Sequence, residues 1–132
     1  MPTAIRQSNI FKATPKRLYG ILMSSREHAA MTANGAAKIS RKPGGAFSCH
    51  GGWISGRHVE LVPGKRIVQA WRAKNWPPGV YSLVTFTLKK AGRGTRLTLD
   101  HTGIPANHSG HLNSGWKARY WRPLRAYLAT HG

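Results

Sequence analysis

The segment LNSGWKARYWRPLRAYL, residues 112–128, decides the fold of this chain of 132 residues. Its apolar residues recur at intervals of three and four, the spacing of one face of an α-helix. The residues of that face are Leu112, Trp116, Tyr120, Leu124, Tyr127 and Leu128. Pro123 removes one helical hydrogen bond and is expected to bend the helix. The pattern predicts a long C-terminal helix, with Asn107 and Ser109 as candidate caps at its start.

The sequence before this helix predicts strands separated by tight turns. Tyr81 to Leu88 is the clearest strand, because it is rich in β-branched and aromatic residues. Further strands are expected at residues 5–11, 47–61, 66–72 and 95–101. The second of these is expected to be one long strand, bent or bulged at its glycines. A helix of about twenty residues spans roughly 30 Å, so it can lie across such a sheet.

Two short helices are predicted between the first two strands. Thr14 followed by Pro15 is typical of a helix start. Ser24 with Glu27 resembles a capping box for a second helix, which Asn34-Gly35 can end.

The composition indicates one domain spanning residues 1–132. Residues of the apolar types make up 40% of the chain, but no run is long enough to span a bilayer. The N-terminus has no apolar core of a secretory signal. The single cysteine, Cys49, fits a reducing compartment. We therefore expect a cytoplasmic protein.

The charge balance is strongly basic, with 21 Lys and Arg against three acids and a formal net charge of +18. Such a chain is expected to bind polyanions without specificity at low salt. The basic residues are scattered along the chain, which does not favour a dedicated nucleic-acid tail. Mutual repulsion favours a monomer or a weak homodimer. Three carboxylates leave little for hard-cation sites or paired acid–base chemistry, so no cofactor or metal is expected.

Several segments together resemble the family of activators of the ninety-kilodalton heat-shock-protein ATPase homologue, within the START-like (SRPBCC, helix-grip) superfamily. The segments that carry the resemblance are Ile5 to Pro15, Gly44 to Phe47, Gly56 to Pro63, Ile67 to Trp71, Gly94 to His101, and Gly115 to Leu128. The resemblance implies an α+β fold in which a curved antiparallel sheet wraps around the C-terminal helix and encloses a cavity.

The superfamily implies several functions, since its members bind lipids, sterols, polyketides and plant hormones, and some are cyclases or hydrolases. The eukaryotic co-chaperone of the family carries a separate N-terminal domain for its chaperone. This chain starts at the first strand, so we expect it to lack that domain.

The candidate site is the space between sheet and helix. Its candidate residues are Trp53, Arg57, Trp71, Phe86, Leu99, His101, Trp116, Arg119 and Tyr120. The aromatic residues line a ligand pocket or simply form the core. The two arginines either bind an anion, such as a fatty or aromatic acid, or extend along the surface.

The histidines and the cysteine are weaker candidates. His101 is a core histidine or, in an enzyme, an acid–base group. His108 and His111 lack an evident third zinc ligand. Cys49 and His50 are expected to point to opposite faces of a strand.

The favoured function is a small-molecule binding module that holds an apolar or amphipathic ligand, with an anionic group as one alternative, in the cavity between sheet and C-terminal helix. The alternatives are a START-like cyclase or hydrolase, with His101 or Tyr120 as its acid–base group, and a chaperone-associated interaction module.

Overall fold

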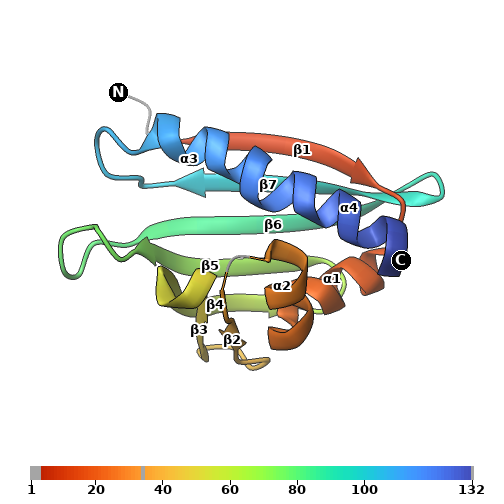
Figure 1. Ribbon diagram of the computed structural model, residues 1–132, viewed down its shortest axis with the longest axis horizontal. Coiled ribbons are helices and arrows are strands. Elements are labelled where there is room, and N and C mark those ends of the chain that lie inside the picture. Colours follow the sequence, from red (N-terminus) through yellow and green to blue (C-terminus); the bar gives the residue numbers. More distant parts are fainter. Residues whose placement is uncertain (1–3, 34, 132) are drawn as a thin grey trace.

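The computed structural model of the protein describes residues 4–33 and 35–131. They form a seven-stranded antiparallel sheet in the order β1-β7-β6-β5-β4-β3-β2, with helices against one face (Figure 1). The strands are β1 (Ile5–Phe11), β2 (Lys38–Ile39), β3 (Ala46–Cys49), β4 (Ile54–Val62), β5 (Arg66–Ala73), β6 (Ser82–Ala91) and β7 (Gly94–Thr102). The first strand therefore pairs with the last, and the helices α1 (Pro15–Met23) and α2 (Ser25–Thr32) lead to the opposite edge. The expectation of one domain over residues 1–132 includes five residues outside the described part.

The two N-terminal helices begin where the sequence predicts. The Thr14 side chain accepts a hydrogen bond from the Arg17 N–H, and the Ser24 side chain accepts one from the Glu27 N–H. The Glu27 carboxylate does not complete the capping box, because it pairs with Arg17 instead. α2 ends at Thr32, and Asn34, expected to help end it, lies outside the described residues.

The prediction of one long strand over residues 47–61 is wrong. The structure has two strands there, β3 and β4, which pair as a hairpin around the 3₁₀ turn η1 (His50–Gly52). His50, Gly51 and Gly52 adopt φ values of 54°, 66° and 90°. Three consecutive residues in the left-handed region reverse the chain instead of bending it.

The C-terminal helix is continuous over 23 residues, through α3 (Ser109–Trp116), the π-helical turn η2 (Lys117–Trp121) and α4 (Arg122–His131). Pro123 explains the π-turn, because its nitrogen has no hydrogen to donate and its ring crowds the preceding turn. The Arg122 N–H instead reaches back five residues to the Lys117 carbonyl. The capping prediction is wrong, since His108 occupies the N-cap without a side-chain hydrogen bond.

The π-turn adds Trp121 to the buried face of the helix, a residue that the apolar sequence pattern does not include. In a regular α-helix, a residue five positions on lies about 140° around the axis. Here Trp121 stacks on Trp116, with ring centroids 5.7 Å apart and an angle of 19° between the planes. The Trp121 indole N–H donates to the Gln7 Oε1 of β1 at 2.6 Å.

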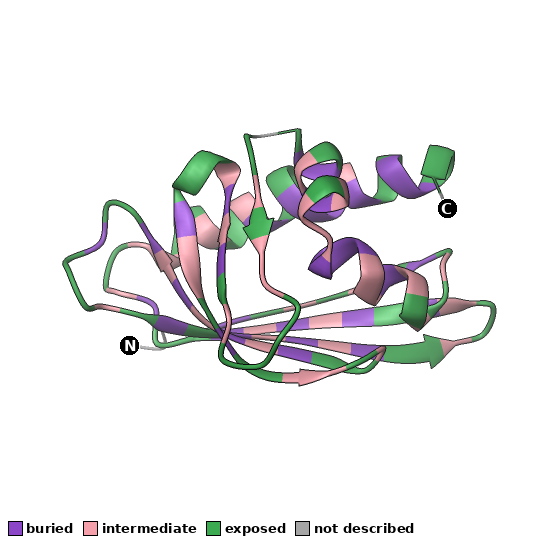
Figure 2. Ribbon diagram, turned by 90° about the horizontal axis from the view of Figure 1, so that it is seen from below, coloured by how far each residue is buried: buried purple, intermediate pink, exposed green. Residues whose placement is uncertain are grey.

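The core lies between the sheet and the helices, as the buried segments of Figure 2 show. On β5 the buried residues alternate with less buried ones, as expected for a strand with one face covered. The α+β helix-grip fold predicted from the sequence is confirmed.

One end of the C-terminal helix is held by a charged cluster. Arg17 donates two hydrogen bonds to the Glu27 carboxylate, at 2.9 and 2.7 Å, and a third to the His131 carbonyl. The Tyr127 hydroxyl donates to the same carboxylate at 2.9 Å. The hydrogen bonds from Arg17 lower the pKa of Glu27 below its usual value. The cluster therefore joins α1, α2 and α4.

The Glu27→Gln substitution should lower the free energy of unfolding by about 1–3 kcal/mol, because the amide cannot accept all three hydrogen bonds. Urea unfolding at pH 7 measures the loss. The matched control is Glu60→Gln, whose ion pair with Arg66 is about half exposed and which should change stability by no more than about 0.5 kcal/mol. Equal losses in the two variants would contradict this assignment.

Candidate functional site

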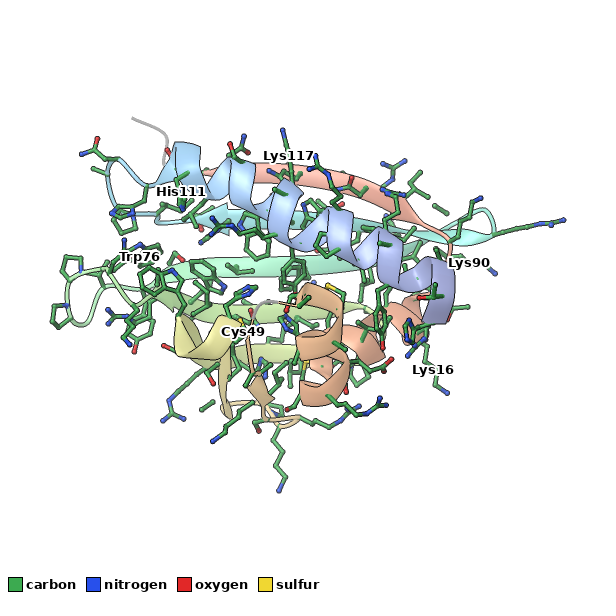
Figure 3. The ribbon with its side chains drawn as sticks, viewed as in Figure 1. Lys16, Cys49, Trp76, Lys90, His111 and Lys117 are labelled. Carbon is green, nitrogen blue, oxygen red and sulfur yellow. The ribbon has the colours of Figure 1, made fainter. Side chains whose placement is uncertain are left out.

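A pocket of about 290 Å³ lies between the inner face of the sheet and the C-terminal helix. Its buried lining comes from both layers: Leu22, His28, Phe47, Cys49, Ile54, Ile67, Gln69, Trp71, Ala73, Trp76, Phe86, Trp116 and Tyr120. Four lining residues are exposed and form its rim: Trp53, Asn75, His111 and Arg119. In Figure 3, Trp76 and His111 lie toward the end where α3 begins, and Cys49 lies nearer the middle.

Four rings, Trp71, Trp76, Phe86 and Trp116, form what we call the aromatic wall. Trp71 lies 5.6 Å from Trp76 and 5.9 Å from Trp116, and Phe86 lies 5.8 Å from Trp116, between ring centroids. These separations are those of favourable tilted aromatic pairs. The pocket thus has rigid, flat, apolar surfaces.

A chain of hydrogen bonds fixes the wall from behind. The Trp116 indole N–H donates to Nδ1 of His101 at 3.1 Å, so the other ring nitrogen of the neutral imidazole carries the hydrogen. That nitrogen, Nε2, lies 2.7 Å from the Ser82 hydroxyl, which in turn donates to the Trp71 carbonyl. Burial lowers the pKa of His101 to about 4. Both nitrogens of His101 are therefore used structurally, in the neutral form.

A second buried pair reaches the pocket from α2. Nε2 of His28 lies 2.8 Å from the Tyr120 hydroxyl, and burial lowers the pKa of His28 to about 4. Burial also raises the pKa of Tyr120 well above its usual value. Sequence reasoning missed His28, because no periodicity marks a buried histidine on so short a helix.

The structure places the nine predicted site residues in three groups. Six of them line the pocket: Trp53, Trp71, Phe86, Trp116, Arg119 and Tyr120. Leu99 and His101 are buried behind the lining. Arg57 is exposed and donates to the Gly44 carbonyl. The even spacing between Trp53 and Arg57 does not place both side chains in the pocket, because Trp53 lies before β4 begins.

Cys49 and His50 both line the pocket, contrary to the expectation that they point to opposite faces. The reason is that His50 starts the η1 turn with a positive φ and leaves the strand alternation. Burial raises the pKa of the Cys49 thiol to about 12. The thiol therefore stays protonated, which does not suit nucleophilic catalysis.

The pocket contains no carboxylate. Asp100 and Glu60 pair with Arg6 and Arg66 on the surface, and Glu27 belongs to the cluster with Arg17. His108 and His111 line the pocket, but the described residues contain no group of three or more His, Cys, Asp or Glu side chains that could hold a metal.

Among the polar side chains of the lining, Arg119 and Gln69 are available to a ligand. Arg119 is exposed at the rim and has no ion pair within residues 4–33 and 35–131. Burial and then the charge of Arg119 lower the pKa of His50. Gln69 is only 8% exposed and faces the pocket from β5, and its amide has no hydrogen-bond partner in the described part of the chain.

Comparison with known proteins identifies a family and several relatives that this chain resembles. The sequence profile of the Activator of Hsp90 ATPase homolog 1-like protein family matches residues 12–129. The human protein named Activator of 90 kDa heat shock protein ATPase homolog 1 is 31% identical over 126 residues, which cover 95% of this chain and 37% of that protein. This chain thus spans less than two fifths of the length of that relative.

Solved structures share the fold. An HSP90 activator from Plasmodium falciparum superposes with a TM-score of 0.90 at 22% identity, covering 96% of each chain. The Aha1 dimer from Colwellia psychrerythraea superposes with a TM-score of 0.81 at 18% identity, covering 98% of each chain. In the described part of this chain, no helix has the length and apolar character needed to cross a membrane.

The two buried histidines should make stability depend on pH. In the unfolded chain they take up a proton near pH 6.5, whereas in the folded protein their pKa values are about 4. The stabilisation is complete above about pH 7 and is lost as the pH falls from about 6.5 to about 4. Each histidine should cost roughly 2 kcal/mol of stability between pH 7 and pH 5. Urea unfolding at these two pH values measures the loss.

Nuclear magnetic resonance gives an independent check of the same groups. The imidazole signals of His28 and His101 should stay those of neutral rings between pH 7.5 and pH 5.5, since burial holds both pKa values near 4. Nitrogen shifts should show His101 protonated at Nε2. Protonation of His101 near pH 6.5 in the folded protein would contradict the hydrogen-bond chain.

Proposed function

The chain belongs to the Activator of Hsp90 ATPase homolog 1-like family, and we propose that it binds a small, mostly apolar, amphipathic molecule in the pocket between the sheet and the C-terminal helix. The observation that carries this proposal is the combination of an open rim, the aromatic wall and the Gln69 amide, which belongs to a residue only 8% exposed and has no hydrogen-bond partner in the described residues. Ligand sites are typically apolar cavities with a few placed polar groups.

The energetics of the pocket support binding. A void beside large buried rings leaves their faces without contacts, which costs stability unless something fills it. A ligand that covers the rings removes this penalty and can also pair with the Gln69 amide, so its binding should stabilise the fold.

The same geometry favours a binding module over a cyclase or hydrolase. His101, the sequence candidate for an acid–base group, has both nitrogens in hydrogen bonds behind the wall. Tyr120 is held by His28, and the high pKa of Cys49 keeps its thiol protonated. These groups position the wall and leave none of the three poised for proton or group transfer.

Filling the pocket tests the proposal directly. Gly115 lines the pocket, and a Cβ added there meets no atom within 4 Å. Gly115→Leu should fill the pocket and abolish binding of an apolar fluorescent naphthalene dye. It should not lower thermal stability, since helical glycine costs about 1 kcal/mol relative to alanine. Fluorescence titration and a thermal melt provide the two readouts.

Gly110→Leu is the matched control, because Gly110 lies in the same helix, is exposed and lies outside the lining. It should bind the dye as the unmodified protein does. If Gly115→Leu bound the dye equally well, dye binding would be a surface effect and the pocket proposal would fail.

A chaperone-associated role is the second candidate function, and the relatives favour it through their names as activators of the 90 kDa heat shock protein ATPase. Because this chain covers only 37% of the human relative, that activity is a proposal here. Adding the purified chain to a 90 kDa heat shock protein should raise its ATPase rate if the role holds. An unchanged rate at saturating chain, with no complex on sedimentation, would exclude it.

We expect the chain to be a monomer or a weak dimer. The basic surface favours a monomer or a weak dimer, and non-specific polyanion binding at low salt.

A further inference from the structure

We propose that the ligand is a planar aromatic carboxylic acid of one or two rings, with its carboxylate at Arg119 on the rim and its ring against the aromatic wall. This inference rests on the proposed function, because it names the chemical class that the same pocket binds.

The sign of the charge follows from where the acids of this chain are. All three are engaged in ion pairs and none lines the pocket, whereas Arg119 lies at the rim without an ion pair in the described residues. The other polar residues of the lining include His50, His108 and His111, and no lining residue has a carboxylate. The net charge of +18 adds a long-range field that attracts anions.

The walls select a flat ring. Trp71, Phe86 and Trp116 present ring surfaces that suit stacked or edge-to-face contacts with another aromatic group. A rigid ring loses little conformational freedom on binding, whereas every rotatable bond of a fatty-acid chain that becomes fixed has an entropic cost.

The volume limits the size. The pocket of about 290 Å³ has the room of about ten water molecules at roughly 30 Å³ each. One or two fused rings with a carboxylate match this space. An alkyl acid of similar size, such as decanoate, also fits, so the volume limits the size and the ring contacts select the shape.

Gln69 indicates a second polar group on the ligand. The residue is nine-tenths buried on the sheet side of the pocket, and its amide has no hydrogen-bond partner in the described part of the chain. Gln69 therefore lies deep in the pocket, whereas Arg119 lies exposed at the opening. A hydroxyl or carbonyl on the ring end remote from the carboxylate can pair with this amide, which both donates and accepts.

The experiment compares three probes by calorimetry on the full chain: a hydroxynaphthoate with its hydroxyl on the ring remote from the carboxylate, the corresponding hydroxynaphthamide, and decanoate. The hydroxynaphthoate should bind roughly tenfold more tightly than the amide, because only the carboxylate forms an ion pair with Arg119. It should also bind more tightly than decanoate.

Two variants and a control locate the contacts. Arg119→Gln should remove the preference for the acid over the amide, whereas Arg122→Gln, exposed on the same helix and outside the lining, should keep it. Gln69→Leu should weaken binding of the hydroxynaphthoate but not of naphthoate without the hydroxyl. Both results support the assignment. A preference that persists in Arg119→Gln overturns the carboxylate position.

The outcomes separate this inference from the proposed function. If acid and amide bind equally, or decanoate binds best, the pocket is a ligand site but the inference is overturned. If none of the three probes binds and Gly115→Leu leaves dye binding unchanged, both fail. If none binds while Gly115→Leu abolishes dye binding, the function stands and the aromatic acid is overturned.

Discussion

The hydrogen-bond chain from Trp116 through His101 and Ser82 to the Trp71 backbone is the constraint on which the rest of the structure depends. It joins the C-terminal helix to β7, β6 and β5 in a single sequence of donors and acceptors. Each member needs the next, because an unsatisfied buried polar atom is costly. The chain fixes the Trp116 ring through its indole N–H, and His101 packs edge-on against the Trp71 ring, with centroids 4.8 Å apart. The pocket persists because polar contacts behind it hold its wall in place.

The scarcity of acids connects stability with function. With only three carboxylates, the chain uses Glu27 to join α1, α2 and α4 and the other two on the sheet surface. The pocket is left with cationic and neutral polar groups. The same composition that makes the surface basic therefore determines which ligands the pocket can hold.

Regular periodicity made most of the fold predictable, and local irregularity hid the rest. The strand alternation around Leu97 and Leu99, and the caps at Thr14 and Ser24, follow general rules, and the structure confirms them. The sequence does not predict the β3–β4 hairpin, because two adjacent glycines allow either a bend or a full reversal of the chain. Only the structure shows that three successive residues there have positive φ values. The sequence predicts Trp71, Phe86, Trp116 and Arg119 as pocket residues, but not Trp76, which the structure buries in the lining. It also does not predict His28 and Gln69, because a pattern of apolar residues does not record which buried polar side chains find partners.

Pro123 shows how one local irregularity reaches the pocket. By denying the helix a hydrogen bond it favours the π-turn over residues 117–121. The wider turn brings Trp121 beneath Trp116, where the two rings stack, and keeps Tyr120 buried beside them. Arg119, the residue before these two, then lies at the rim with its charge in solvent. The position of Arg119, which lines the pocket, thus follows from a proline four residues away that lies outside the described lining.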